Sequence, residues 1–334
     1  MKRLGKLGFA LVVGSWMTIG VVAAQTLAQR NWAPESMLFN DALTFARLAP
    51  FIAAIGILVG IWQARNAARA GGDRIVGQSV VRHDRGTTVA HWVNATGSIV
   101  SLATGAIILG WVHWPAEIRV IFLLHFVGAA LKLYAVPNHL TRHGVAGGFG
   151  LIPRSWAALR DTMTEMFEYA GVFGRGRAAF GIPWPKGFRQ PIARYLRGLG
   201  LKKPEGGKYL AAEQTLSYPV WGILTVVVVI TGLIKTLRYV YPMPSAFIGA
   251  TTMVHDLAAI GIAVMLLVHL APLLLVPGNW PLLKSMFTTR VPVQYVKEHH
   301  PAWYQQLLRK PVVSEPVAPA APRTEALASL KGGD

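Results

Sequence analysis

Residues 251–276 read TTMVHDLAAIGIAVMLLVHLAPLLLV, an apolar stretch that holds two histidines, His255 and His269. Fourteen residues of α-helix advance about 21 Å and turn through about 1400°, close to a whole number of turns. Both imidazoles therefore project from one face, one toward each side of a bilayer whose apolar core is about 30 Å thick. Histidine is costly in the hydrocarbon and marks a candidate functional site there. The stretch predicts two metal centres at two depths of one membrane.

The composition is that of an integral membrane protein. Of 334 residues, 53% are hydrophobic and only 14% are charged, which does not fit a soluble domain. The chain has no cysteine, which excludes thiolate-bound iron–sulfur clusters, c-type haem attachment and disulfides. The net charge of +18 is carried between the apolar segments, so we interpret it as a set of topology determinants facing anionic lipid. Nucleic acid is not an expected partner.

Apolar segments of near-spanning length recur five times, which predicts an all-α membrane protein. They cover about 48–63, 89–111, 118–136, 218–234 and 247–277. The last four predict a four-helix transmembrane bundle. The first predicts one additional N-terminal transmembrane helix.

The regions outside these segments have distinct compositions. Residues 1–24 start basic, continue apolar and close on the small-residue pattern VAA, as in a signal peptide or a retained signal anchor. Residues 25–47 would then be periplasmic. In the long connection 137–217, the stretch LIPRSWAALRDTMTEMFEY predicts a helix on the membrane surface. The Pro/Ala-rich residues 312–334 predict a disordered cytoplasmic tail.

Loop charges predict the orientation of the segments. Five arginines lie in 64–88, and most of the remaining basic residues lie in 137–217 and after residue 278, whereas 112–117 has no lysine or arginine. The basic connections are expected in the cytoplasm, and this agrees with an exported N-terminal segment. We therefore expect a multi-pass protein of a bacterial inner membrane with a cytoplasmic C-terminus.

Four of the ten histidines fall within the apolar segments: His91, His125, His255 and His269. The orientation places His91 and His269 near the cytoplasm and His125 and His255 near the periplasm. Depth alone therefore pairs His91 with His269 and His125 with His255, each pair coming from different helices. Two imidazoles fill both axial positions of a haem iron, which suits electron transfer rather than ligand activation. The sequence predicts two haem b groups as cofactors.

Other polar residues in these segments leave alternatives open. A histidine inside the membrane can simply bond a neighbouring helix, although four that pair by depth are harder to explain in this way. His139 also lies fourteen residues from His125, but it follows Pro137, where a helix end is expected. We therefore place His139 and His143 at the interface. Lys132 needs a partner inside the bundle or a path to the cytoplasmic surface, and a haem propionate is one candidate.

Five motifs follow one another along residues 82–307: HWVNATGSIVSLATG, FLLHFVGAALKLY, a segment closing on Thr231-Gly232, VHDLAAIGIAVMLLVH and KEHHPAWY. Together they resemble the cytochrome b (gamma) subunit of membrane-bound formate dehydrogenase, within the di-haem cytochromes b that include nickel–iron hydrogenase b subunits. The resemblance implies the same two histidine pairs as haem ligands. It also implies partner subunits, one with iron–sulfur clusters and one catalytic with molybdenum or a similar centre. Electrons would pass between them and the membrane quinone pool.

The family's quinone contacts are altered in this chain. The family carries an Asn and a Gln near the quinone, in a stretch like KYNAGQ, where this chain has KYLAAEQ with Leu210 and Glu213 at those positions. We expect Glu213 or Gln214, beside His269, to take their place. The partner could equally belong to a hydrogenase or to another molybdenum or iron–sulfur oxidoreductase, and electrons could flow outward from quinol.

Two alternatives from other classes stay open. A proton or metal transporter could use the intramembrane histidines, and it would show no visible absorption. A purely structural membrane anchor would keep quinone-coupled activity after replacement of His255. The chain shows no nucleophile–base arrangement and no phosphate-binding loop, so we expect the substrate chemistry to reside in partner subunits.

Overall fold

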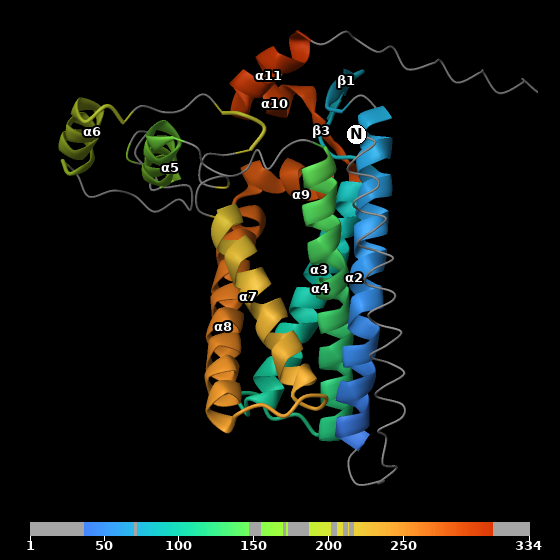
Figure 1. Cartoon of the computed structure of the whole chain (residues 1–334). Helices are drawn as coiled ribbons and strands as arrows, with labels where there is room; N and C mark the ends of the chain where they lie inside the picture. The colour runs from blue at the N-terminus through green and yellow to red at the C-terminus, as the bar shows by residue number, and fades with distance from the viewer. Residues whose placement is uncertain are drawn as a thin grey trace, which may run out of the picture.

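The structure, a computed structural model, describes residues 37–69, 72–146, 155–169, 172, 187–201, 206–209, 213 and 217–309. The predicted signal peptide, the predicted tail, and Leu210 and Gln214 of the candidate quinone loop lie outside the described residues. Within them, five long helices run side by side (Figure 1). They are α2 (Met37–Arg69), α3 (Arg85–Ile108), α4 (Ile118–Val145), α7 (Tyr218–Leu237) and α8 (Ser245–Leu275).

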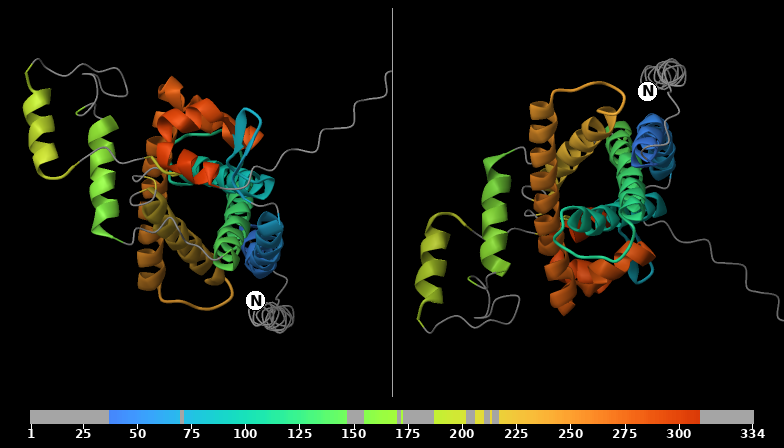
Figure 2. Two further views of the ribbon diagram at one scale, coloured as in Figure 1. Left: turned by 90° about the horizontal axis from the view of Figure 1, so that it is seen from above. Right: turned by 90° about the horizontal axis from the view of Figure 1, so that it is seen from below.

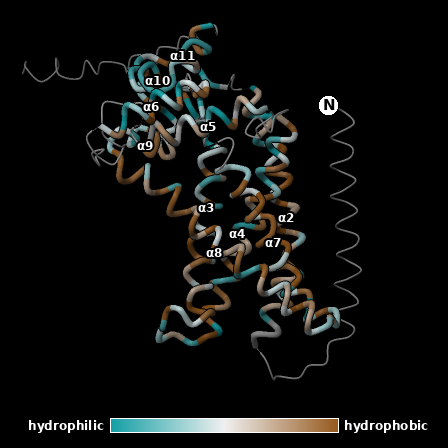
Figure 3. Tube along the Cα trace, turned by 90° about the vertical axis from the view of Figure 1, so that its left-hand side faces the viewer, coloured by the Kyte–Doolittle hydropathy of each residue, from teal (hydrophilic) through white to brown (hydrophobic). Residues whose placement is uncertain are grey.

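Four of these helices are long and apolar enough to cross a membrane, namely α2, α4, α7 and α8. Helix α3 is not among them because Thr, Asn, Ser and His interrupt its apolar residues. Coloured by hydropathy, the bundle is mostly hydrophobic along its length, and hydrophilic residues gather at the end that carries α10 and α11 (Figure 3). The described chain is therefore a mostly helical, multi-pass membrane fold, with α3 as its most polar long helix.

Two antiparallel hairpins build the bundle. Helices α3 and α4 pack closely together, as do α7 and α8, and α2 packs along α4. Seen along the bundle, α2 lies outside α4, and the α7–α8 hairpin stands across from α3 and α4 (Figure 2). This arrangement lets α8 face helices of the other hairpin along its length.

Helix α2 is longer than the sequence indicates. It begins at Met37, well before the apolar segment expected from residue 48, because its first turns also pack on α4. The rings of Phe45 and Phe126 stack with centroids 5.1 Å apart, and the guanidinium of Arg119 pairs with the carboxylate of Asp41 at 2.8 Å. The polar first turns are thus held by tertiary contacts that hydropathy does not register.

Two glycines bring α2 and α4 into backbone contact. A Cβ at Gly56 would overlap the carbonyl oxygen of Tyr134, and one at Gly60 would lie 2.7 Å from the carbonyl oxygen of Asn138. The buried Asn138 side chain donates a hydrogen bond of 3.3 Å to the Gly56 carbonyl. Small residues four apart let membrane helices approach in this way. The Gly-x-x-x-Gly spacing was the signal that our sequence interpretation did not use.

The expected helix end at Pro137 is wrong, because α4 continues through this proline to Val145. Membrane helices tolerate an internal proline when neighbouring groups satisfy the freed backbone. The long connection therefore begins later than expected, and His139 lies on a helix rather than in a loop.

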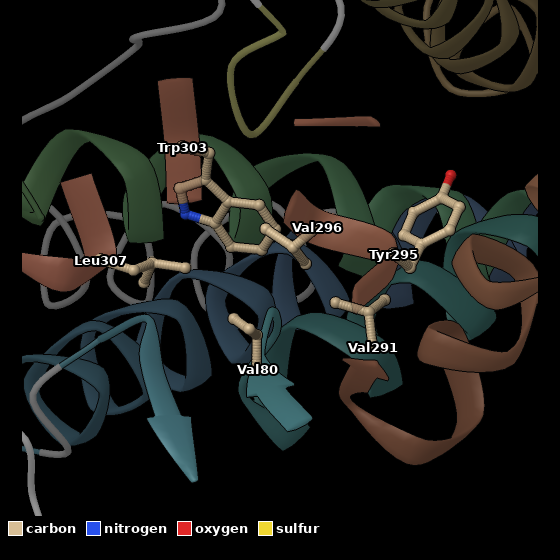
Figure 4. Close-up of a cluster of buried hydrophobic side chains, with 6 residues drawn as sticks. All are labelled: Val80, Val291, Tyr295, Val296, Trp303 and Leu307. Atoms are coloured by element: carbon tan, nitrogen blue, oxygen red, sulfur yellow. The ribbon is translucent and has the colours of Figure 1, made fainter. Parts of the chain in front are cut away.

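A small folded cap closes one end of the bundle. Strands β1 (Arg74–Val76), β2 (Ser79–Val81) and β3 (Arg290–Pro292) form an antiparallel sheet in that order. The cap also contains η2 (Pro277–Asn279), α9 (Trp280–Thr288), α10 (Val293–His299) and α11 (Pro301–Leu308). Its core unites six side chains from both regions of the chain (Figure 4): Val80, Val291, Tyr295, Val296, Trp303 and Leu307. The sheet was not expected, because three-residue strands are too short to show an alternating pattern.

Helices α5 (Trp156–Tyr169) and α6 (Arg189–Gly198) lie at the cap end of the bundle, on the side away from α2, with α6 farther out than α5 (Figures 1 and 2). Helix α5 falls within the stretch expected to form a surface helix. A small apolar cluster around Ala193 and Leu196 of α6 includes Phe167 of α5. The described parts of the long connection thus contain structure of their own.

Candidate functional site: two histidine pairs

Helix α8 contributes one histidine to each of two pairs. Near the end of the bundle away from the cap, His255 faces His125 of α4, and their ring centroids are 6.5 Å apart. Nearer the cap, His269 faces His91 of α3 with ring centroids 6.4 Å apart. Each pair therefore joins α8 to one helix of the other hairpin.

The separations within both pairs fit a haem iron between two imidazoles. A metal–imidazole bond is about 2 Å long, and each bonded nitrogen lies about 1 Å from its ring centre, so axial ring centroids are about 6 Å apart. The ring planes are inclined by 52° and 61°, and axial imidazoles can take any such angle about the iron axis. Among the described residues, no three His, Cys, Asp or Glu side chains gather to bind a bare metal ion. The residues thus fit bis-histidine haem.

A threonine on the preceding helix holds each histidine of the pair farther from the cap. Thr104 Oγ1 of α3 lies 2.9 Å from His125 Nδ1, and Thr231 Oγ1 of α7 lies 3.0 Å from His255 Nδ1. Each hydroxyl also donates to a carbonyl one turn earlier on its own helix, at 2.6 Å in both cases. Because the hydroxyl proton is used there, the threonine oxygen accepts from Nδ1–H of the histidine.

This hydrogen bonding assigns the tautomer of both rings. A neutral imidazole with its proton on Nδ1 presents a lone pair on Nε2, which is the atom that a metal takes. A hydrogen-bond acceptor at the other nitrogen of a ligating imidazole fixes the orientation of the ring and raises the basicity of the ligand. The glycine that follows each threonine lies against the same ring, because a Cβ at Gly105 would be 3.8 Å from His125 Cε1 and one at Gly232 would be 3.3 Å from His255 Cε1. The two Thr-Gly sequences therefore occupy equivalent positions in the two hairpins, each against a histidine of the following helix.

Tryptophan side chains, rather than threonine hydroxyls, contact the histidines of the pair nearer the cap. The ring of Trp92 lies edge-on to His91 with centroids 5.5 Å apart, and Trp221 of α7 lies 6.3 Å from His269. Trp92 also donates a 2.9 Å hydrogen bond to the Met286 carbonyl of α9. The Glu213 carboxylate lies within electrostatic range of His269. The loop before α7 thus places an acidic side chain near this pair.

Lys132 finds its partners inside the bundle. Its side chain is buried between α4 and α3, and the ammonium donates to Ser98 Oγ at 2.7 Å and to Asn94 Oδ1 at 3.3 Å. The sequence left open whether Lys132 has a partner inside the bundle or reaches the cytoplasmic surface. The structure shows partners inside the bundle, on α3. Both acceptors belong to the polar residues that set α3 apart from the other long helices.

The other described histidines do not join the two pairs. His139 and His143 of α4 contact each other, with centroids 4.3 Å apart, and His113 is exposed. In the cap, burial first and then the positive charges of Arg82 and Lys208 lower the pKa of His83 to about 3. His300 is also buried in the cap, and its Nδ1–H donates to the Gly207 carbonyl at 2.6 Å.

The fold is a helical membrane bundle, and the ring separation in each of its two histidine pairs fits a haem iron. These are the features of a membrane cytochrome b. The model of the prokaryotic cytochrome b561 family matches residues 82–289, and the chain belongs to this family. That membership confirms the cytochrome b resemblance noted in the sequence, and it implies haem b binding.

The chain is also similar to the cytochrome b556(Fdn) subunit of nitrate-inducible formate dehydrogenase from Escherichia coli K12. The two are 25% identical over 126 residues, which is 38% of this chain and 55% of the relative. The corresponding subunits of E. coli O157:H7 and Shigella flexneri match to the same extent. The chain therefore spans about half the length of the curated relatives it matches. No solved structure matches the chain significantly.

Proposed function

We propose that this chain is a di-haem cytochrome b subunit that carries electrons between a partner oxidoreductase of the formate dehydrogenase type and the membrane quinone pool. The observation that carries the proposal is the pair of ring separations, 6.5 and 6.4 Å, at two levels of α8. Haem b supplies reversible one-electron transfer when bound. His125 and His255 would hold one haem, and His91 and His269 the other.

The protein's own contribution is to hold ligands, fix protons and exclude water. Thr104 and Thr231 keep Nδ1–H of His125 and His255 in place, so that each Nε2 stays directed at the metal position. The apolar helices surround the haem positions with a medium of low dielectric. The Lys132 ammonium is hydrogen-bonded to α3, at a height between the two histidine pairs.

The direction across the membrane follows from loop charge. With the basic cap and the connection after α4 in the cytoplasm, the His125–His255 pair lies near the periplasm and receives electrons from an iron–sulfur partner subunit there. The His91–His269 pair lies near the cytoplasm, where a quinone binds beside His269, Glu213 and Gln214. Proton uptake at that side would make the electron transfer electrogenic.

The test is a reduced-minus-oxidised spectrum with haem quantification on the purified full-length chain. Two b-type haems per chain are expected, and a chain that binds none would refute the proposal. His255→Ala should remove one haem and His269→Ala the other. His113→Ala, a change at an exposed histidine, serves as the control and should leave both haems in place.

The identity of the partner needs a separate measurement. The altered quinone loop, with Leu210 and Glu213, keeps a hydrogenase or another molybdenum or iron–sulfur enzyme as the second candidate. Affinity purification of the tagged chain from its own cells should recover an iron–sulfur subunit together with a catalytic subunit. The substrate that reduces the haems in this complex identifies the partner, and formate is the expected one.

A further inference from the structure

A second group of rings lies at the cap end of the bundle and is not used by the haem positions. The Nε2 atom of His139 on α4 is 2.6 Å from the hydroxyl oxygen of Tyr218, the first residue of α7. The ring of His143, one turn further along α4, lies 4.3 Å from that of His139 between centroids. A tyrosine hydrogen-bonded to one histidine and a second histidine in ring contact with the first thus lie together across two helices.

This group reaches the surroundings of His269 through α7. Trp221 follows Tyr218 by three residues, so both project from the same face of the helix. The Trp221 ring centroid is 6.3 Å from that of His269. Tyr218 therefore lies one helical turn from the residue that flanks the proposed haem ligand, in the region where the quinone is proposed to bind.

The other end of the group leads toward water. Arg142, between His139 and His143 along α4, forms an ion pair with Asp84, the N-cap residue of α3. The Asp84 side chain is 36% exposed, whereas that of Arg142 is 11% exposed. Arg142 also interacts electrostatically with His139, so an ion pair with a partly exposed carboxylate lies near the histidines.

We propose that Tyr218 exchanges the proton with one oxygen of a quinone headgroup bound beside Trp221, and that His139 and His143 carry this proton to and from the aqueous side. The inference rests on the proposed function, because it places quinone chemistry at this end. It adds a proton path to one quinone oxygen that uses residues outside the altered KYLAAEQ loop.

The chemistry balances as a two-electron, two-proton reduction. The quinone takes two electrons, one at a time, from the nearer haem position. At one oxygen the Tyr218 O–H bond breaks as the quinol O–H bond forms, and the tyrosine regains a proton from His139 Nε2. His143 and then water restore the proton on His139. The other oxygen takes its proton from water, which passes it through the Glu213 carboxylate, and quinol oxidation reverses every step.

The hydrogen bond between His139 and Tyr218 also holds α4 against α7. The variants must therefore distinguish a role in proton transfer from a role in holding the two helices together. Tyr218→Phe keeps the ring and removes the hydroxyl. His139→Gln can still bond the tyrosine hydroxyl, but an amide neither releases nor takes up a proton near neutral pH. Tyr241→Phe and His113→Gln are matched controls, because both residues are exposed in the connections at the opposite end of the bundle.

The experiment uses the full-length chain with its haems in detergent and follows haem reduction by stopped flow. The electron donors are a short-chain ubiquinol and a short-chain menaquinol, so no partner subunit is needed. We expect Tyr218→Phe and His139→Gln to slow reduction at saturating quinol at least tenfold. Calorimetric titration with the oxidised quinone should show about fivefold weaker binding in Tyr218→Phe, from one lost hydrogen bond, and unchanged binding in His139→Gln.

The outcomes distinguish three cases. Variants that keep both haems and are reduced at the wild-type rate overturn the proton path alone. A rate loss in His139→Gln that is matched by an equal loss of quinone affinity and a lower unfolding temperature shows a tether, and also overturns it. A wild-type chain with two haems that accepts no electrons from either quinol overturns the proposed quinone function and this inference with it.

Discussion

Replacing Thr104 with valine tests how the chain holds a haem ligand. Thr104 Oγ1 accepts from His125 Nδ1–H at 2.9 Å and donates to the Val100 carbonyl at 2.6 Å. Valine keeps the branched shape but removes this acceptor, so the buried N–H is left with the Ser101 carbonyl as its acceptor. The loss of one hydrogen bond of this kind costs about 0.5–1.5 kcal/mol.

Loss of the hydrogen bond between Thr104 and His125 destabilises the oxidised and the reduced haem iron to different extents. A hydrogen bond from Nδ1–H raises the basicity of the ligand, which stabilises the oxidised iron more than the reduced iron. Removing the acceptor should therefore raise the reduction potential. A tenfold change in a one-electron equilibrium is about 59 mV, so each kcal/mol that falls on the oxidised form raises the potential by about 40 mV.

The assay is a redox titration of the haem absorbance in the purified full-length chain. Thr104→Val should raise the potential of one haem and leave the other unchanged. Thr231→Val should raise the potential of the same haem, because Thr231 holds His255, the opposite ligand. Thr236→Val is the matched control, since Thr236 is a buried threonine of α7 whose hydroxyl bonds only its own helix, at the Leu233 carbonyl.

A potential that stays unchanged or falls, with both haems retained, would refute this reasoning. A rise in both haems alike would also contradict it, because among the described residues threonine acceptors bond only the His125–His255 pair. Equal effects of Thr104→Val and Thr236→Val would show that the change comes from helix packing.

Three further predictions concern the fold that supports the site. Gly56→Ala should destabilise the chain by about 1–3 kcal/mol through overpacking against Tyr134, whereas Gly249→Ala, whose Cβ would meet nothing within 4 Å, should not lower the unfolding temperature. Asp84→Ala should cost about 1–2 kcal/mol, because Asp84 caps α3 by accepting from Thr87 N–H at 3.0 Å, and an unchanged unfolding temperature would contradict this. Burial holds the pKa of His300 at about 4, below its ordinary 6.5, so the folded state binds fewer protons than the unfolded state between these values. The contribution of His300 to stability should be full above pH 6.5 and fall by about 3 kcal/mol by pH 4. His300→Asn should therefore reduce the acid loss of stability by about this amount in unfolding scans, and should leave the part that comes from His83.

Much of the candidate site follows from local sequence pattern. Hydropathy locates α4, α7 and α8 because each must be apolar over a span's length. The spacing of His255 and His269 fixes their common face, since both lie on one regular helix. The chain without cysteine leaves histidine as the main candidate ligand for haem. These features depend only on residues within one helix or on composition.

Other features depend on residues that are far apart in the chain. The sequence marks Thr104 only as part of a motif, and the packing of α3 on α4 makes it the acceptor for His125. His139 was placed at an interface, and its partner Tyr218 is set by where α7 begins against α4. No local pattern specifies these contacts, because each one is selected by how two helices pack.

The sequence by itself therefore determined the apolar helices, the two-level histidine spacing on α8 and the membership in a cytochrome b family, because periodicity and hydropathy act locally. The tertiary structure decided which groups meet: the threonines that hold His125 and His255, the bonds of Lys132 to α3, and the glycine contact of α2 with α4. It also decided the cap, where residues 74–81 pair with residues 290–292. These contacts arise only when separate segments are packed together, since hydrogen bonds and close approaches between helices depend on their relative placement.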